Sequence, residues 1–279
     1  MKTIQLFGMK IDSLRMSEAV ERVRSWIDEP FERMRYVVTP NLDHAVLFQD
    51  RADLRAAYAD ASLTIADGQP LIWASRLLRK PLPERVAGSD LVPRLFDDAD
   101  RRGRELTVFL LGAAPGVGAR AADAIAKRWK HVRVVGVESP PLGFDKSEAE
   151  TERLLAAIEQ AAPDLLLVGL GAPKQELWIH RHRERIHARA ALGIGAVIDF
   201  LAGERQRAPV WMQRCGIEWL HRISQEPKRL GKRYAYDAWR FPQLLLREAF
   251  SRKAKETDAA TDPEVAYRVA ATASRRSAV

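Results

Sequence analysis

The chain has 279 residues, and 47% of them are hydrophobic, which is enough to bury the core of one large domain or of a domain with an appendage. Its one cysteine, Cys215, excludes an internal disulfide and a cysteine-rich zinc site, and suits a reducing compartment. The formal net charge is +8. The sequence has neither the apolar stretch of a signal peptide nor a run of about eighteen apolar residues, so we expect neither a signal peptide nor a spanning helix.

The first hundred residues predict short strands that alternate with helices. Each boundary is marked by polar or turn-forming residues. At the same points the spacing of the apolar residues changes between that of a strand, every second residue, and that of a helix, every third or fourth. Ser17 is the expected cap of the first helix, and a break near Asp50 is expected to divide a longer helical segment. In chain order, the expected elements are a short hairpin or a strand with a glycine turn at 4–12, a helix at 17–27, a strand at 35–41, two helices within 42–60, a strand at 63–68, and helices at 70–78 and 86–103.

The middle of the chain continues this alternation. The run LTVFLLG at 106–112 is apolar throughout, as is typical of a parallel strand covered on both faces. Further strands are expected at 132–137, 163–171 and within 190–200, with helices after the turn at 113–116, at 147–162 and at 173–186, the last with Pro173 as its first residue. The order of elements predicts an α/β fold with a largely parallel sheet flanked by helices over residues 1–207.

From about Ala208 the pattern becomes helical and basic. Between Glu204 and Lys255, thirteen Lys and Arg residues face five acidic residues, which equals the net charge of the whole chain. We therefore expect a helical C-terminal appendage at 208–255 that meets a polyanion or an anionic membrane; a solvated charged surface is the alternative. Aromatic residues interleave with these cations, as at a membrane interface; the alternative is that they pack the appendage onto the core, and both can hold on different faces. The composition of 256–279 predicts a disordered tail.

Two glycine-containing turns follow predicted strands. The first turn contains Gly112, Gly116 and Gly118, whose spacing is not the G-x-G-x-x-G of dinucleotide-binding turns. Two interpretations of this turn therefore stay open: contact with a nucleotide, or a tight turn without a ligand. In the second turn, Gly171 permits close approach, and Lys174, Gln175 and Glu176 follow in the first turn of a helix, where free N–H groups favour an anion. The alternative is an ordinary surface helix that begins with proline.

Asp67 and Gly68 end a short apolar strand, where an α/β fold places its chemistry, although Asp-Gly also favours a simple turn. Three further positions follow the same logic. Thr39 and Asn41 end the preceding strand, and Asn41 is also a natural helix cap. Arg85 stands just before Gly88 and Ser89, free to bind a phosphate with its planar fork.

The histidines lack the spacing of metal ligands, and no Asp-x-Asp pair ends a strand. Neither a P-loop nor a G-x-S-x-G elbow is present. We therefore expect no metal site.

Seven blocks, taken together and in this order, resemble the WecG/TagA/CpsF glycosyltransferases, glycosyltransferase family 26. They are TPNLDHA, ADGQPLIWASR, ERVAGSDL, LLGAAPGV, PDLLLVGLGAPKQELWI, GIGAVIDFLAGERQRAP and GIEWLHRISQEPKRLGKRY, and the resemblance covers about residues 4–246. The resemblance implies a Rossmann-like core and inverting, metal-independent transfer from a UDP-sugar to a polyprenyl-diphosphate-linked saccharide at the inner face of the cytoplasmic membrane. It implies no cofactor. The donor sugar stays open among N-acetylmannosamine, its uronic acid and glucose.

By this resemblance Asp67 matches the catalytic base, and Thr39, Asn41, Arg85 and Gln175 match active-site positions. Basic positions of the appendage that meet the diphosphate match Arg222, Arg229 and Lys232; Lys232 departs from the pattern if arginine is usual there. A homo-oligomer that changes on meeting a membrane is a further hypothesis. The competing hypotheses are a nicotinamide-dependent oxidoreductase that uses the turn at 110–118 and a nucleic-acid binder that uses the basic segment; we expect no nucleic-acid partner.

Overall fold

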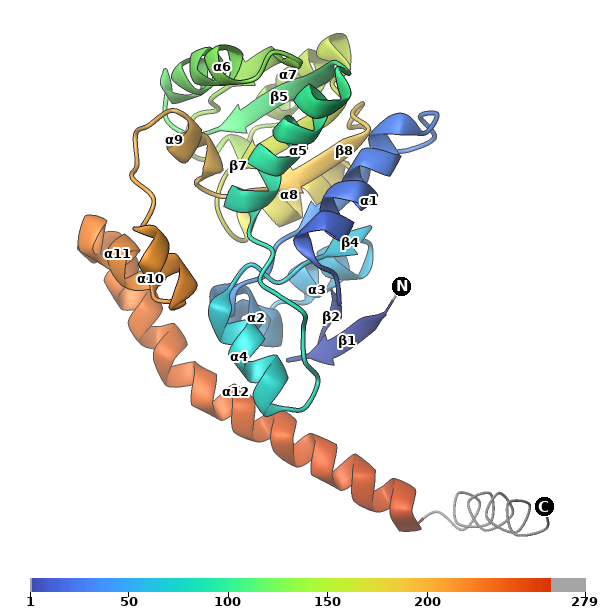
Figure 1. The fold of residues 1–279 in the computed structure, drawn as a ribbon, viewed down its shortest axis with the longest axis vertical. Coiled ribbons are helices and arrows are strands. Elements are labelled where there is room, and N and C mark those ends of the chain that lie inside the picture. Colours follow the sequence, from blue (N-terminus) through green and yellow to red (C-terminus); the bar gives the residue numbers. More distant parts are fainter. Residues whose placement is uncertain (1, 262–279) are drawn as a thin grey trace, which may run out of the picture.

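The computed structural model describes residues 2–261, which form a sheet covered by helices on both faces and three further helices at the C-terminal end (Figure 1). The strands are β1 (Thr3–Leu6), β2 (Met9–Asp12), β3 (Arg35–Val38), β4 (Leu63–Thr64), β5 (Leu106–Gly112), β6 (Val132–Glu138), β7 (Leu165–Gly169) and β8 (Ala190–Gly193). The helices of the core are α1 (Met16–Asp28), α2 (Leu42–Asp50), α3 (Ala52–Ala59), α4 (Gln69–Leu77), α5 (Gly88–Arg102), α6 (Val117–Arg128), the 3-10 turn η1 (Phe144–Lys146), α7 (Glu148–Ala161), α8 (Lys174–His182) and α9 (Val197–Leu201).

Six strands form one parallel sheet in the order β4-β3-β8-β7-β5-β6, which confirms the predicted α/β class. Both faces are buried. Along β5, Phe109 and Leu111 enter the hydrophobic core shared with α2, α3, α4, α7 and α8, whereas Val108 and Leu110 enter the core shared with α1, α5, α6 and α9. The continuous apolar run at 106–112 is therefore explained by a strand that is buried on both sides.

The structure corrects three details of the sequence-based elements. Ser17 lies inside α1 and is not its cap; the helix starts after Arg15, whose backbone N–H donates to Glu18 Oε2 at 2.6 Å. Pro173 precedes α8 as its cap residue instead of starting it. The strand expected at 63–68 is only two residues long, because its partner β3 ends at Val38 and the chain turns into α4 soon afterwards.

The appendage consists of α10 (Val210–Arg214), α11 (Glu218–Gln225) and α12 (Pro227–Thr261). In Figure 1 the long helix α12 crosses the core beside α2. Phe241 of α12 packs edge-on against Phe7 with ring centroids 6.2 Å apart, and Leu244 is buried in the core. Further along, Lys80 Nζ lies 2.8 Å from Glu248 Oε1. The inner face of α12 is thus attached to the core both by apolar contacts and by ion pairs.

α12 continues to Thr261, beyond residue 256, where the tail was expected to begin. The rest of the predicted tail, residues 262–279, lies outside the described residues. Of the helices within residues 2–261, none combines the length and the hydropathy that crossing a bilayer requires.

Candidate active site

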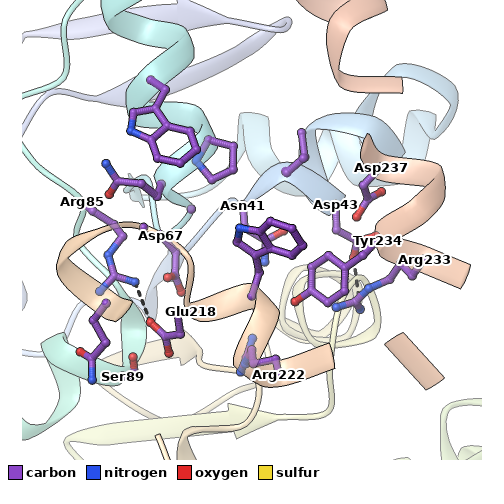
Figure 2. A pocket seen from close by; sticks show the side chains of 18 of the residues that line it. Asn41, Asp43, Asp67, Arg85, Ser89, Glu218, Arg222, Arg233, Tyr234 and Asp237 are labelled. Carbon is purple, nitrogen blue, oxygen red and sulfur yellow. Dashed lines mark hydrogen bonds and ion pairs between the residues drawn. The ribbon is translucent and has the colours of Figure 1, made fainter. Parts of the chain in front are cut away.

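A cavity of about 330 Å³ lies at the carboxyl ends of β3, β4 and β8, and the appendage lines its other side (Figure 2). The chain leaves β3 for α2 on one face of the sheet and leaves β8 for α9 on the other. Adjacent strands whose chains depart to opposite faces leave a crevice between them, the usual ligand site of open parallel sheets. The sheet supplies the floor of this cavity, and α11 and α12 supply two of its walls.

Asp67 is fixed at the floor by the backbone around it. The N–H groups of Ile65 and Asp67 donate to the carbonyls of Val38 and Pro40 at 3.0 and 2.9 Å, so the chain still follows β3 after β4 ends. Gly68 packs against the next loop: a Cβ there would lie 3.0 Å from Asn41 Cα. This close contact presses the β3–α2 and β4–α4 turns together and directs the Asp67 carboxylate into the cavity.

Opposing effects act on the proton affinity of Asp67. Burial, the largest, raises its pKa, and the negative charge of Glu218 raises it further. The guanidinium groups of Arg85 and Arg222, and a 3.4 Å hydrogen bond from the Gly88 N–H to Oδ2, lower it. The net effect is a pKa above the ordinary value of an aspartic acid. A carboxylate with a raised pKa is a better proton acceptor than one in water.

Two arginines bring positive charge to the same side of the cavity. Arg85 donates from Nη1 to Glu218 Oε2 at 3.2 Å and from Nη2 to Asp90 Oδ2 at 3.3 Å. Arg222 lies over the ring of Phe200, 5.7 Å from its centroid, and within the described part of the chain no carboxylate is at ion-pair distance from it. Arg222 therefore has donors free for a ligand anion, whereas those of Arg85 are shared with two carboxylates.

Ion pairs attach α11 to the core beside these arginines. Arg207 donates to both oxygens of Asp90 at 2.6 and 2.8 Å, and its Nε lies 3.7 Å from Glu218. Burial would raise the pKa of Asp90, but Arg207 and Arg85 hold it below its usual value. Asp90 of the core and Glu218 of α11 thus bind the same two arginines, Arg85 and Arg207. These shared ion pairs position α11 as a wall of the cavity.

A buried polar network lies behind the cavity. Asn41 caps α2 by accepting from the His44 N–H at 3.3 Å, and His44 Nε2 lies 3.1 Å from Glu176 Oε1. Gln175 donates to that same oxygen at 2.7 Å and accepts from the Gly195 N–H at 3.0 Å. Burial would lower the pKa of His44, but the charge of Glu176 raises it above its usual value. The network connects the loop after β3, the start of α8 and the loop after β8.

Comparison with known proteins identifies the family to which this chain belongs. A model of the glycosyl transferase WecG/TagA/CpsF family matches residues 4–255. The chain belongs to this family. A relative from Staphylococcus aureus is 29% identical over 232 residues, which cover 82% of this chain and 87% of the relative. Another from Bacillus spizizenii is 30% identical over 194 residues, which cover 70% and 72%. Both carry the name N-acetylglucosaminyldiphosphoundecaprenol N-acetyl-beta-D-mannosaminyltransferase. Membership of a glycosyltransferase family takes precedence over the oxidoreductase and nucleic-acid-binding alternatives.

The cavity brings together six of the site residues predicted from the sequence. They are Asn41, Asp67, Gly68, Arg85, Ser89 and Arg222. Gly88 and Thr39 lie beside the lining: the first donates to Asp67, and the second donates from Oγ1 to the Gly193 carbonyl at 3.1 Å. Gln175 and Glu176 belong to the buried network behind it. The binding and catalytic roles of all these residues remain predictions.

The other predicted residues lie outside the cavity lining. Gly171 and Lys174 are at the start of α8, where Lys174 is exposed, and Lys232 is exposed on α12. The side chain of Arg229 lies outside the described part of the structure. Gly112 has a packing role, since a Cβ there would lie 2.5 Å from the Gly169 carbonyl oxygen. This contact accounts for a glycine after β5 without any nucleotide.

Sequence reasoning found Arg222 on α11 but missed the rest of the lining that α11 and α12 supply. Glu218, Trp219, Arg233, Tyr234 and Asp237 all line the cavity. One signal was available: Asp237 is the only acid between Glu226 and Glu248, in an otherwise basic segment. A lone acid among cations indicates a specific contact more than a solvated surface.

Among residues 2–261, no three or more His, Cys, Asp or Glu side chains are grouped so as to hold a metal ion.

Proposed function

We propose that this chain transfers a sugar, with inversion, from a UDP-sugar to a polyprenyl-diphosphate-linked saccharide in the synthesis of a cell-surface polymer, with Asp67 as the general base. The observation that supports it best is the position of Asp67 in one cavity with Arg85 and Arg222. The names of the two relatives make N-acetylmannosamine the first donor sugar to test and an N-acetylglucosaminyl diphospholipid the first acceptor.

In the proposed reaction the Asp67 carboxylate takes the proton of the acceptor hydroxyl as that oxygen bonds to the anomeric carbon. The bond from the anomeric carbon to the UDP oxygen breaks, and UDP departs with the electron pair. In this proposal Arg222 and Arg85, whose charges act on Asp67, stabilise the negative charge that develops on the diphosphate. Attack opposite to the departing group inverts the anomeric configuration.

Asp67→Asn tests the base assignment, because asparagine keeps the shape and loses the basic oxygen. We expect turnover of UDP-N-acetylmannosamine with a short-chain lipid acceptor to fall at least about a hundredfold, within the range of general-base contributions. Calorimetric affinity for the donor should change little. The matched control is Asp123→Asn, at an exposed position of α6. A variant at Asp67 with full turnover would show that another group removes the proton.

Binding at an anionic membrane surface on the cytoplasmic side is the second part of the proposal. The outer face of α12 carries exposed apolar side chains at helical spacing, among them Trp239 at 62% and Phe250 at 67% exposure, with Tyr236 and Leu246 on the same face. Lys232 and Arg247 are exposed on this helix too. Aromatic rings at headgroup depth with cations beside them are typical of peripheral membrane helices.

Co-sedimentation with vesicles tests this surface. We expect the chain to bind vesicles rich in phosphatidylglycerol more tightly than neutral vesicles, and Leu246→Glu to weaken that binding. Leu142→Glu places the same charge at an exposed leucine outside the appendage and serves as the control. Equal loss in the two variants would contradict a role for α12. Sedimentation velocity with and without lipid tests the predicted change in oligomeric state.

A further inference from the structure

A second polar group of side chains occupies the side of the cavity opposite Asp67 and takes no part in the reaction described above. Asp43 lies in the first turn of α2, and Arg233 and Asp237 lie on the facing part of α12 (Figure 2). Arg233 Nη1 is 3.5 Å from Asp43 Oδ2. All three residues line the cavity, although Asp43 and Asp237 are only 8% and 2% exposed.

Two buried atoms of this group have no hydrogen-bond partner among the described residues: Asp237 Oδ2 and Arg233 Nε. An unpaired buried polar atom is rare and costly, because it has lost its water without gaining a partner. Burial and the charge of Asp43 raise the pKa of Asp237 to about 7, although Arg233 and His44 lower it. An acceptor and a donor at the edge of a cavity, both unpaired, favour a ligand that offers both kinds of group.

The charges of the group narrow the chemistry of that ligand. A phosphate would meet two carboxyl groups, and a cation would meet the guanidinium of Arg233. A neutral ligand with several hydroxyl groups meets neither repulsion, and each hydroxyl both donates and accepts. The aromatic rings of Trp219 and Tyr234, with centroids 6.3 Å apart, line the same cavity and offer an apolar surface to one face of a sugar ring.

We infer that Asp237, together with Asp43 and Arg233, forms a subsite that binds the hydroxyl groups of a pyranose ring. This inference rests on the proposed function, which places two such rings in the cavity: the transferred sugar of the donor and the first sugar of the acceptor. The chemistry of the subsite suits either ring. The Arg85 and Arg222 side of the cavity binds the diphosphate, and the Asp237 side orients a sugar.

The test uses the full chain with Asp237→Ala, and Asp237→Asn as the variant that preserves shape. Calorimetry gives the affinities for UDP and for UDP-N-acetylmannosamine, and steady-state kinetics gives KM for the lipid acceptor. The control is Glu248→Ala, which removes another acid of α12 that pairs with the core at Lys80 and is absent from the cavity lining. Circular dichroism checks that each variant is folded.

For a donor-ring subsite, we expect Asp237→Ala to weaken UDP-sugar binding about tenfold or more while UDP binding stays within about twofold, the size of one lost hydrogen bond to a charged group. For an acceptor-ring subsite, the acceptor KM rises by a similar factor and donor binding is unchanged. Normal values for both ligands, or equal weakening of UDP and UDP-sugar, would overturn the subsite and leave the proposed function intact. A wild-type chain that binds neither UDP nor UDP-sugar would overturn both.

Discussion

Replacing Asp237 with asparagine should stabilise the protein at neutral and alkaline pH and have much less effect at pH 5. Asp237 is buried on α12, and its pKa is raised from 3.8 to about 7. The native state therefore holds this proton more tightly than the unfolded chain does. The resulting contribution to stability is complete below about pH 4 and is lost as the pH rises through about 7.

The size of the effect follows from the shift. One pKa unit corresponds to about 1.4 kcal/mol, so wild-type stability falls by about 4 kcal/mol over the whole window and by about 2 kcal/mol between pH 5 and pH 7 through this one group. Asparagine has the same shape and no charge to bury. The variant should therefore gain about 2 kcal/mol relative to wild type over those two pH units, or roughly 4 to 8 °C in Tm for a chain of this size.

Urea unfolding of wild type and Asp237→Asn at pH 5, 6, 7 and 8 measures this difference. Asp123→Asn, on the exposed side of α6, is the control for removing one carboxylate elsewhere. A stability difference between wild type and Asp237→Asn that matches the control at every pH would refute the reasoning. A confirmed gain would show that Asp237 is kept at the cost of stability, as is typical of residues that serve binding.

Three further substitutions test how the cavity is built. Gly216→Val should detach the α10–α11 turn, because a Cβ would lie 2.3 Å from Gln69 Cγ at a φ of +73°; we expect faster trypsin cleavage in the appendage and at least tenfold lower activity, and an unchanged digestion pattern would contradict this. Gly112→Ala should destabilise the core by about 2–4 kcal/mol in urea unfolding, more than Gly143→Ala, which has positive φ with no close neighbour. Glu218→Gln should lower the pKa of Asp67, so the acid limb of the kcat/KM profile moves to lower pH; a shift to higher pH would show that Glu218 acts otherwise.

The core could be predicted from the sequence because its signals are local. Buried parallel strands are apolar runs, and β5 and β7 were found as such within two residues of their ends. Asp67 could be predicted for the same reason, since an acid after a short strand lies at the carboxyl edge of the sheet wherever that strand is placed. β4 proved shorter than expected because its partner supplies only a short ladder before the chain turns into α4.

The α12 side of the cavity could not be predicted in the same way. Helical spacing with basic and aromatic residues is typical of a helix at a membrane surface and equally of a helix that forms a cavity wall. α12 has one face exposed to solvent and another that lines the cavity. Which residues face inward depends on how the helix docks, through Phe241 and Leu244, on elements some two hundred residues earlier in the chain. These are tertiary contacts, and the spacing of apolar residues along α12 does not show with which elements the helix makes them.

The two walls of the cavity are attached to the core by different kinds of force. α11 buries no residue and is tied to the core through Glu218, which faces Arg85 and Arg207. α12 also has ion pairs with the core, at Lys80 and Asp43, but it has buried apolar contacts through Phe241 and Leu244 in addition. Ions in solution screen ion pairs and leave apolar contacts almost unaffected. Ionic strength therefore acts more strongly on one side of the cavity: as salt rises, the α11 side loosens first, and soluble ligands gain an exchange route there while apolar contacts keep α12 docked.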